Sequence, residues 1–291
     1  MSETQAPAIL PQDSLDGLLV GLSVSESDDL PRLGLIETHF RLALGEIARC
    51  VLVGGGRISY AGHVAASGYT PYLLKELQRY HRRDRPLVLS LPWPVHRSLS
   101  RGELDAQRTE MGLFGGLECL DEAGNAMADP FIGRGDAAAP TSDRVAIAAS
   151  LSAMRKSLAQ RCDARVLIGG RRTGYQGVMP GVAEEAIAVA EAGKPLFLAA
   201  GFGGATLDVA KALGVDDGAW FPSAFSAGGD PGLAKALTRL ETLRTSGALV
   251  QNGLNEDENK KLAATHRPSE IAALVSLGLG RLFALNLPPS S

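Results

Sequence analysis

The sequence has few of the residues that mark metal-bound, disulfide-bonded or membrane-spanning proteins. It contains only three cysteines, Cys50, Cys119 and Cys162, and none of them has CxxC spacing. This excludes a zinc-ribbon pattern or a disulfide framework and favours buried free thiols in a reducing compartment. No apolar run reaches the roughly 18 residues of a membrane span. The first 13 residues lack the charged-then-apolar order of a signal peptide. We therefore expect a cytoplasmic protein with no metal site, no cofactor and no membrane partner.

An excess of charge of one sign is also lacking. The formal net charge is -3, and acidic and basic residues are interspersed along the chain. One basic run, at 81–85, suits the C-terminal end of a helix, where cations favour the helix dipole. A groove for single-stranded nucleic acid needs clustered lysine and arginine, so we expect no nucleic-acid partner.

What the sequence does contain is an alternation of short apolar runs with amphipathic segments. This pattern predicts a doubly wound α/β fold, with a parallel, Rossmann-like sheet covered by helices on both faces. Strands are expected at 17–25, 57–61, 86–91, 113–120, 164–168 and 195–199. Helices are expected at 38–52, 70–81, 142–161, 180–192, 201–213 and over most of 231–286. Residues 92–94, Pro-Trp-Pro, are expected to form a loop.

No linker or short repeat divides the chain, which predicts a single domain. We expect residues 1–13 to be a disordered tail and residues 14–286 to be the domain, with a core at about 17–213 and a helical extension at about 231–286. The apolar helix expected near 271–285 needs a surface to cover. A second copy or the same chain could supply that surface, and a homo-oligomer is expected.

The 34 glycines exceed the usual share of about 7% and cluster where strands end. Ligands of open α/β sheets bind outside the carboxyl ends of the strands, at the point where the strand order reverses. Glycine lets a phosphate approach the backbone, and helix N-termini attract anions. Neither a GxGxxG fingerprint at its proper spacing nor a GxxxxGK[ST] loop is present. The glycine-rich ends therefore predict an anionic, nucleotide-like ligand without naming its class.

These strand ends supply the candidate ligand-binding residues. They are Ser23, Ser25, Gly62, His63, Gly68, Gly169, Gly170, Arg171, Arg172, Gly174, Gly177, Gly181, Glu184, Glu185, Gly201, Phe202 and Gly203.

Several of these candidates have a second interpretation. Arg171 and Arg172 could meet phosphate oxygens or be exposed loop charges. Glu184 and Glu185, at the start of a helix, could face the ligand or only complement the helix dipole. His63 could bond a phosphate or base, or be a surface histidine. In the same loop, Tyr175 could stack on a base or pack against the protein.

The segment from Pro180 to Glu185 carries a resemblance to a known family. It resembles the end of the PGGxGTxxE motif of the cytokinin-activating phosphoribohydrolases, with Glu185 at the position of the motif's glutamate. The pair Arg155-Lys156 resembles the Arg-Lys pair on the preceding helix of those proteins. The chain, over roughly 17–213, is thus similar to the SLOG superfamily, which includes these hydrolases and the sensor domains of antiphage and ion-channel proteins.

Departures from the hydrolase motif favour the sensor branch. Here the glycine loop is longer, and Val182 stands where the motif has threonine. The resemblance implies binding or sensing of a nucleotide or NAD-derived ligand, in signalling or antiphage defence, with a separate effector protein as a partner. The alternative it implies is a nucleoside 5'-monophosphate phosphoribohydrolase. In that case Arg155, which the resemblance adds to the ligand-binding candidates, and Glu185 would be catalytic.

Overall fold

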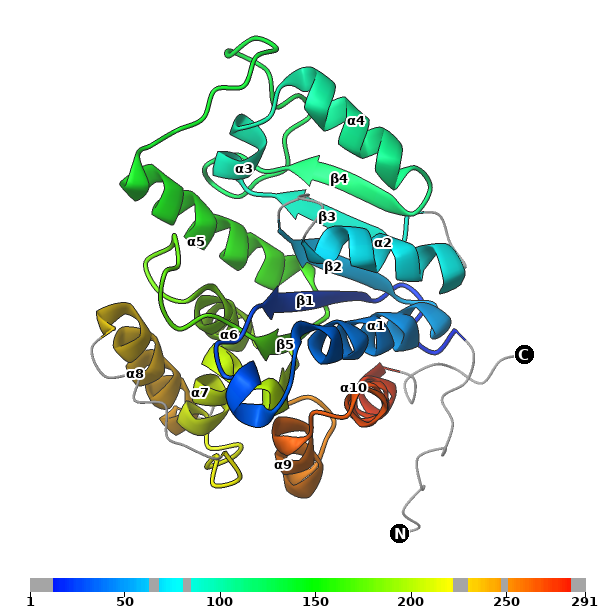
Figure 1. Ribbon diagram of the computed structural model, residues 1–291, viewed down its shortest axis with the longest axis vertical. Coiled ribbons are helices and arrows are strands. Elements are labelled where there is room, and N and C mark those ends of the chain that lie inside the picture. The colour runs from blue at the N-terminus through cyan, green and yellow to red at the C-terminus, as the bar shows by residue number, and fades with distance from the viewer. Residues whose placement is uncertain (1–12, 63–67, 81–84, 222–229, 247–250, 284–291) are drawn as a thin grey trace.

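The central element of the molecule is a six-stranded, all-parallel sheet in the order β4-β3-β2-β1-β5-β6 (Figure 1). The computed structural model describes residues 13–62, 68–80, 85–221, 230–246 and 251–283. The strands are β1 (Leu19–Ser25), β2 (Arg57–Ala61), β3 (Leu87–Leu91), β4 (Gly115–Cys119), β5 (Ala164–Gly169) and β6 (Leu196–Ala199). The chain runs outward from β1 to β4 and then crosses back to β5, so the strand order reverses between β1 and β5. The predicted doubly wound, Rossmann-like α/β fold is confirmed.

Helices cover both faces of this sheet. They are α1 (Glu37–Val53), α2 (Tyr69–Tyr80), α3 (Trp93–Arg97), α4 (Arg101–Met111), α5 (Arg144–Arg161), α6 (Gly181–Glu191), α7 (Gly204–Ala212), α8 (Pro231–Thr245), α9 (Glu256–Ala264) and α10 (Pro268–Phe283), with 3-10 turns at Leu30–Leu33 and Ala200–Phe202. Val166 and Ile168 of β5 belong to the core that contains α1 and α2, whereas Leu167 belongs to the core that contains α6 and α7. Because both faces of β5 are covered by helices, all of its residues are buried.

The C-terminal helical region packs onto the same chain. The apolar side of α10, including Ile271, Val275 and Leu279, joins the core formed with α1. Figure 1 shows α10 beside α1 at the lower right of the sheet. The surface that this apolar helix needs is therefore supplied within the chain, and α10 itself gives no reason to expect an oligomer. Among the described helices, none is both long and apolar enough to cross a membrane.

The prediction of a loop at 92–94 is wrong, because the short helix α3 begins at Trp93. Pro92 is the residue before the first helical turn, and Pro94 lies inside that turn. Backbone N–H groups there have no partner within the helix, so a proline loses no hydrogen bond and its fixed φ favours the turn. The following helix, α4, was also not expected. Its start carries a local signal, since Ser100 and Glu103 cap each other reciprocally.

His96 in α3 is 1% exposed, and its Nε2 lies 2.9 Å from the carbonyl oxygen of Leu120. A carbonyl only accepts, so the ring is held with a proton on Nε2. Burial lowers the pKa of His96, and the nearby Arg134 and Arg97 lower it further, although the bond to Leu120 acts in the opposite direction. The folded protein therefore holds this histidine neutral at pH values where an unfolded chain already binds a proton.

We expect this histidine to make folding stability fall in mild acid. A group whose folded pKa lies below its unfolded value of about 6.5 contributes fully above that pH, and its contribution is lost as the pH falls through it. Urea unfolding at pH 7.5 and pH 5.5 should show the loss. His96→Gln keeps an N–H donor for Leu120 but does not titrate, so its pH dependence should be weaker. Equal pH dependence in the two proteins would contradict the assignment.

Candidate functional site

A pocket of about 420 Å³ opens where the strand order reverses. We call it the switch-point pocket, and its size lies within the ~300–1,000 Å³ of small-molecule sites. Its walls come from the ends of β1 and β2, the start of α2, the segment that enters α3, α5, the loop after β5 and the start of α6. The lining residues are Ser23, Val24, Ser25, Glu26, Tyr60, Ala61, Gly62, Tyr69, Pro92, Val95, Leu151, Met154, Arg155, Arg171, Gly174, Tyr175, Gln176, Gly181, Val182 and Glu185.

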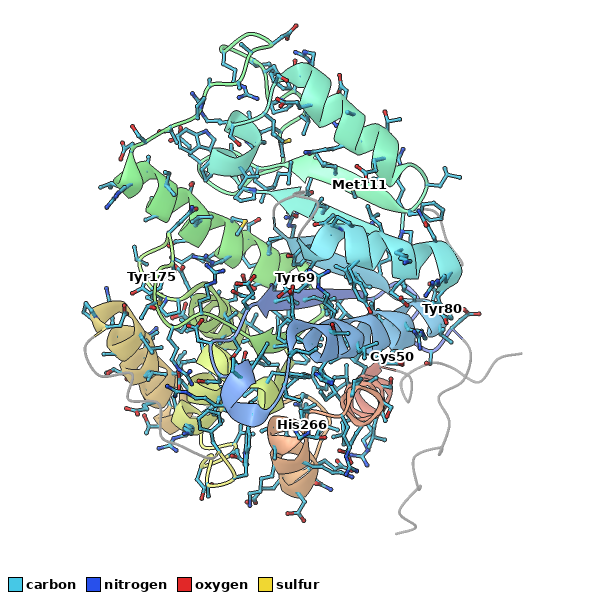
Figure 2. The ribbon with its side chains drawn as sticks, viewed as in Figure 1. Cys50, Tyr69, Tyr80, Met111, Tyr175 and His266 are labelled. Carbon is cyan, nitrogen blue, oxygen red and sulfur yellow. The ribbon has the colours of Figure 1, made fainter. Side chains whose placement is uncertain are left out.

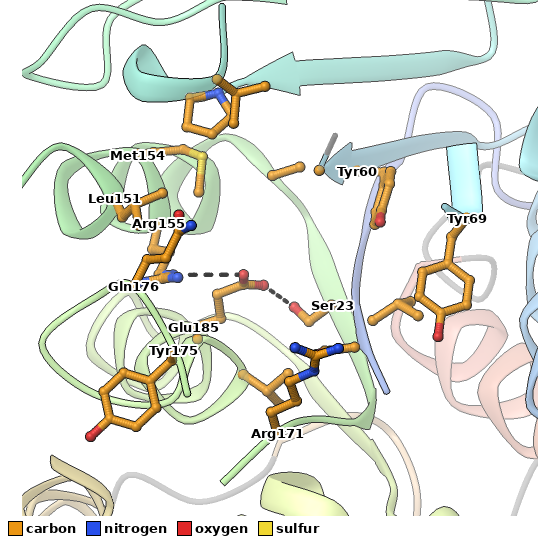
Figure 3. Close-up of a pocket in the computed structure, with 18 of the residues that line it drawn as sticks. Ser23, Tyr60, Tyr69, Leu151, Met154, Arg155, Arg171, Tyr175, Gln176 and Glu185 are labelled. Carbon is orange, nitrogen blue, oxygen red and sulfur yellow. Dashed lines mark hydrogen bonds and ion pairs between the residues drawn. The ribbon is translucent and has the colours of Figure 1, made fainter. Parts of the chain in front are cut away.

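Glu185 is the carboxylate on the floor of this pocket, near the start of α6. Its Oε2 accepts hydrogen bonds from the Ser23 hydroxyl at the end of β1 and from Nη1 of Arg165 in β5, the latter at 2.6 Å. The same Nη1 also donates to Ser23 Oγ at 3.0 Å. Three elements thus close a triangle around one carboxylate oxygen. The other oxygen, Oε1, lies 3.9 Å from Nε of Arg155, which Figure 3 shows facing Glu185.

Arg155 of α5 links the floor to the neighbouring carboxylate. Its Nη1 donates to Oε2 of Glu184, whose other oxygen accepts from the Ser152 hydroxyl. A Cβ added at Gly177 would lie 2.8 Å from Nη1 of Arg155, and one at Gly181 would lie 2.9 Å from its Nη2. These two glycines therefore let the backbone approach the protein's own guanidinium. The paired arginines and glutamates leave the floor close to neutral overall.

The rest of the pocket wall combines tyrosines with apolar and polar side chains. Arg171, 53% exposed at its side chain, pairs with Glu26 just after β1. Burial raises the pKa of both Tyr60 and Tyr69, so both hydroxyls stay protonated at neutral pH. The start of α6, with its positive dipole end, opens onto the same space at Gly181. The wall thus offers hydroxyls, aromatic faces, one exposed cation and a helix N-terminus.

Tyr175 lies on the pocket rim but turns its hydroxyl outward. That hydroxyl donates to Oδ1 of Asp230 at 2.6 Å, and Asp230 also caps the N-terminus of α8 through the Leu233 N–H. Figure 3 shows the ring pointing away from Glu185, with Tyr69 on the other side of the pocket, and Figure 2 labels both tyrosines on the whole molecule. Burial and the bond to Asp230 raise the pKa of Tyr175 to about 12. The hydroxyl is thus bonded to the protein itself, which favours packing over stacking on a base for this residue.

Arg172, the neighbour of Arg171, lies outside the pocket and is 3% exposed. Its Nη1 donates to Oδ2 of Asp29 and its Nε to Oδ2 of Asp208, each at 2.5 Å. Burial lowers the pKa of Arg172, but hydrogen bonds and charges from Asp208 and Asp29 outweigh burial, so the net shift is upward. Asp29 also accepts the Gly204 N–H at 2.7 Å. The N-terminus of α7 is therefore occupied by the protein's own carboxylate.

The comparison with known families agrees with this geometry. A family model described as SLOG cluster 2 matches residues 14–262. The chain belongs to the SLOG cluster 2 family. No curated protein matches the chain. Membership in this family suggests a ligand-binding role related to nucleotides, and the pocket at the strand reversal of the SLOG fold is where such a ligand is expected.

The SLOG domain brings about half of the candidate residues to the pocket. Those that line it are Ser23, Ser25, Gly62, Arg155, Arg171, Gly174, Gly181 and Glu185, while Gly177 and Glu184 contact Arg155 from behind. Gly68, just before α2, is not among the lining residues. His63 lies outside the described residues.

The remaining candidates pack inside the SLOG domain. A Cβ at Gly169 would lie 2.4 Å from the Ser25 carbonyl oxygen, and one at Gly170 would lie 3.0 Å from Val182. Gly201 closely approaches the Thr265 carbonyl, Gly203 approaches Asp29, and Phe202 stacks edge-on against Phe40. Close contacts with backbone atoms at Gly169 and Gly201, and with side chains at Gly170 and Gly203, explain these glycines without a ligand.

Sequence reasoning missed Arg165, Tyr60 and Tyr69. Arg165 had a signal in the sequence, because it is a charged residue within an otherwise apolar strand. The structure adds that it pairs in register with Gly21, the glycine of β1. A buried charge in a parallel strand needs a partner, and a glycine opposite makes room for it. Tyr60 and Tyr69 gave no signal beyond their places at the end of a strand and the start of a helix. Among the described residues, no group of three His, Cys, Asp or Glu side chains could hold a metal ion.

Proposed function

We propose that the switch-point pocket binds a phosphate-bearing nucleotide or NAD-derived molecule, and that the protein senses this ligand without cutting it. The observation that carries the proposal is the state of Glu185. Its Oε2 is occupied by Ser23 and Arg165, which leaves Oε1 as an acceptor for a ligand. An anchored carboxylate with one open oxygen suits a sugar hydroxyl, which must donate its proton to bind there.

The walls of the pocket offer partners for the other parts of such a ligand. Arg171 can exchange the exposed Glu26 for a phosphate, because an exposed ion pair is worth little in water. The N-terminus of α6 adds unpaired backbone N–H groups for the same anion. Tyr60 and Tyr69 supply aromatic surface for a base. We also propose a separate effector protein, which would respond to the occupied state.

One observation favours the hydrolase alternative. Arg155 and Glu185 lie in the same pocket with Nε and Oε1 3.9 Å apart. A carboxylate beside the sugar could stabilise the positive charge that develops when an N-glycosidic bond breaks, with the arginine holding the phosphate. Against it stands the engagement of both carboxylates, since Glu184 is bound by Ser152 and Arg155 and half of Glu185 is bound by Ser23 and Arg165.

Thermal-shift screening followed by chromatography tests the two functions together. The purified chain is melted with NAD, ADP-ribose, cyclic ADP-ribose isomers and nucleoside monophosphates, and each ligand that raises Tm is incubated and analysed. We expect a stabilising ligand to be recovered intact. A saturating ligand at 100 times its Kd should stabilise the fold by about 2.7 kcal/mol.

Two results would oppose the sensor function. A monophosphate converted to free base and ribose phosphate, with turnover lost in Glu185→Gln, would make the protein a phosphoribohydrolase. If no ribosyl phosphate in the panel changed Tm, nucleotide binding itself would be rejected. Arg281→Ala is a suitable control for the screen, because it removes an ion pair with Glu258 between α10 and α9, outside the pocket.

A further inference from the structure

Arg165 is the most deeply buried charge next to the pocket, with a side chain 2% exposed. It stands in β5 at a position that an apolar residue would fill at lower cost, since a buried ion needs several kcal/mol of compensation. Among the described residues, its Nε has no hydrogen-bond partner, and beyond the pocket its guanidinium reaches only Cys162 Sγ, at 3.7 Å from Nη2. The contacts that compensate for its burial are therefore those made by Nη1.

Nη1 of Arg165 is directed at the carboxylate on the pocket floor. It lies 2.6 Å from Oε2 of Glu185 and 3.0 Å from Oγ of Ser23. Gly21 makes this reach possible, because a Cβ there would lie 2.9 Å from Cζ of Arg165. The guanidinium thus runs across the β1 backbone to the pocket.

These contacts fix both the orientation of the carboxylate and the proton of the serine. Because Arg165 donates to Ser23 Oγ, the serine hydroxyl accepts from the arginine and directs its own proton to Oε2 of Glu185. Oε2 thereby accepts two bonds, whereas Oε1 accepts none from the described residues. One oxygen is anchored to the protein and the other is left toward Arg155.

We propose that Arg165 is a positioning residue that holds Glu185 with Oε1 presented to a sugar hydroxyl, and so makes the pocket select ribosyl over deoxyribosyl ligands. This rests on the proposed function. Arg165 itself does not touch the ligand. With Arg165 replaced, the carboxylate loses its strongest anchor and can turn to Arg155, so the hydroxyl of the ligand no longer meets a fixed acceptor.

The test compares ribosyl with deoxyribosyl probes in paired variants. Calorimetry is performed with AMP and ADP-ribose and with their 2'-deoxy and 3'-deoxy counterparts. A hydrogen bond to a charged group is worth about 1.5–3 kcal/mol, so the wild type should prefer a ribosyl probe over one of its deoxy forms by about 10- to 100-fold. In Arg165→Met this ratio should fall to within about threefold of one, and Arg165→Lys, which keeps a charged donor, should restore part of it.

If Arg165→Met only destabilised the fold, it would weaken the binding of ribosyl and deoxyribosyl probes equally. The ratio of their affinities would then stay at the wild-type value, and that result would overturn the proposal. Arg281→Met is the control, because it removes another guanidinium-carboxylate pair, Arg281 with Glu258 at 2.6 Å, away from the pocket. It should keep the wild-type ratio. If Arg165→Met does not fold, Ser23→Ala removes the other donor to Oε2 and should lower the ratio in the same direction.

A crystal structure of ligand-free Arg165→Met or Arg165→Lys separates this inference from the proposed function. We expect the Glu185 carboxylate to leave Ser23 in the methionine variant. A carboxylate that stays in place would overturn the positioning role whatever the ligand is. The wild type could bind none of the probes while the Glu185 carboxylate still moves in Arg165→Met. The proposed function and the ribosyl selection would then be wrong, but the role of Arg165 in positioning Glu185 would be supported.

Discussion

Replacing Arg172 with alanine is expected to lower the free energy of unfolding by about 3–5 kcal/mol. Removing one partner of a buried ion pair leaves the other charge buried and uncompensated, which is costlier than the pair itself is worth. Here two carboxylates would be left, Asp29 with a fully buried side chain and Asp208 with an 11% exposed one. Asp29 keeps the Gly204 N–H as a donor, but Asp208 loses both of its bonds to Arg172.

Arg171→Ala is the matched control for this change. It removes the neighbouring arginine, whose pair with Glu26 is more than half exposed at both side chains. Exposed pairs contribute about 0–1 kcal/mol, so the ligand-free stability should change by no more than that. Denaturant unfolding at neutral pH measures both variants. Comparable losses in the two would show that burial does not distinguish these arginines, contrary to the structure.

The sequence could not separate these two arginines because their partners are distant along the chain. Arg172 pairs with Asp29, 143 residues earlier, and with Asp208, 36 residues later. Arg171 meets Glu26, from the same loop that carries Asp29. Both arginines follow the same strand in the same glycine-rich stretch, so the local sequence predicts the same role and the same exposure for both. Only the tertiary arrangement of the β1 loop and α7 assigns one to the pocket and the other to the core.

The glycine-rich strand ends predicted where a pocket lies but not what each glycine contacts. The pocket does lie at the ends of β1, β2 and β5, as the strand alternation indicated. Gly177 and Gly181, however, make room for Arg155, and Gly203 makes room for Asp29. A glycine records that something approaches the backbone closely, and a protein side chain satisfies that condition as well as a phosphate does.

The strands and the long helices could be predicted because their apolar periodicity is local. The strand at 57–61 was predicted with the bounds that β2 has, and the helix expected at 38–52 differs from α1 by one residue at each end. The Pro-Trp-Pro pattern predicts a loop rather than the short helix α3, because proline disfavours a helix interior, although in the first turn it favours a helix. The buried contacts of Arg165 depend on strand register, which the chain pattern alone does not give.

Replacing Glu185 with glutamine is expected to have the largest effect on ligand binding. If Oε1 accepts a hydroxyl of the ligand, the amide loses the negative charge and presents either an N–H or a weaker neutral acceptor there. A hydrogen bond to a charged group contributes about 1.5–3 kcal/mol, so Kd should rise by about 10- to 100-fold. Glutamine has nearly the same shape as glutamate and can still accept from Arg165, so the fold should be retained. Calorimetry with a ligand that stabilises the wild type measures the change.

Glu184→Gln is the sharpest comparison, because Glu184 is adjacent in sequence and equally paired but does not line the pocket. It is bound by Ser152 and Arg155, with its side chain 12% exposed against 14% for Glu185. If the effect comes from facing the ligand, Glu184→Gln should change Kd by less than about fivefold, or about 1 kcal/mol, because it acts on the ligand only through Arg155. Equal effects in the two variants would mean that both carboxylates act only through the shared arginine, and Glu185 would lose its place as the acceptor of the ligand. A wild-type Kd in Glu185→Gln would have the same consequence, since Oε1 is the open oxygen on which the proposed recognition of the sugar depends.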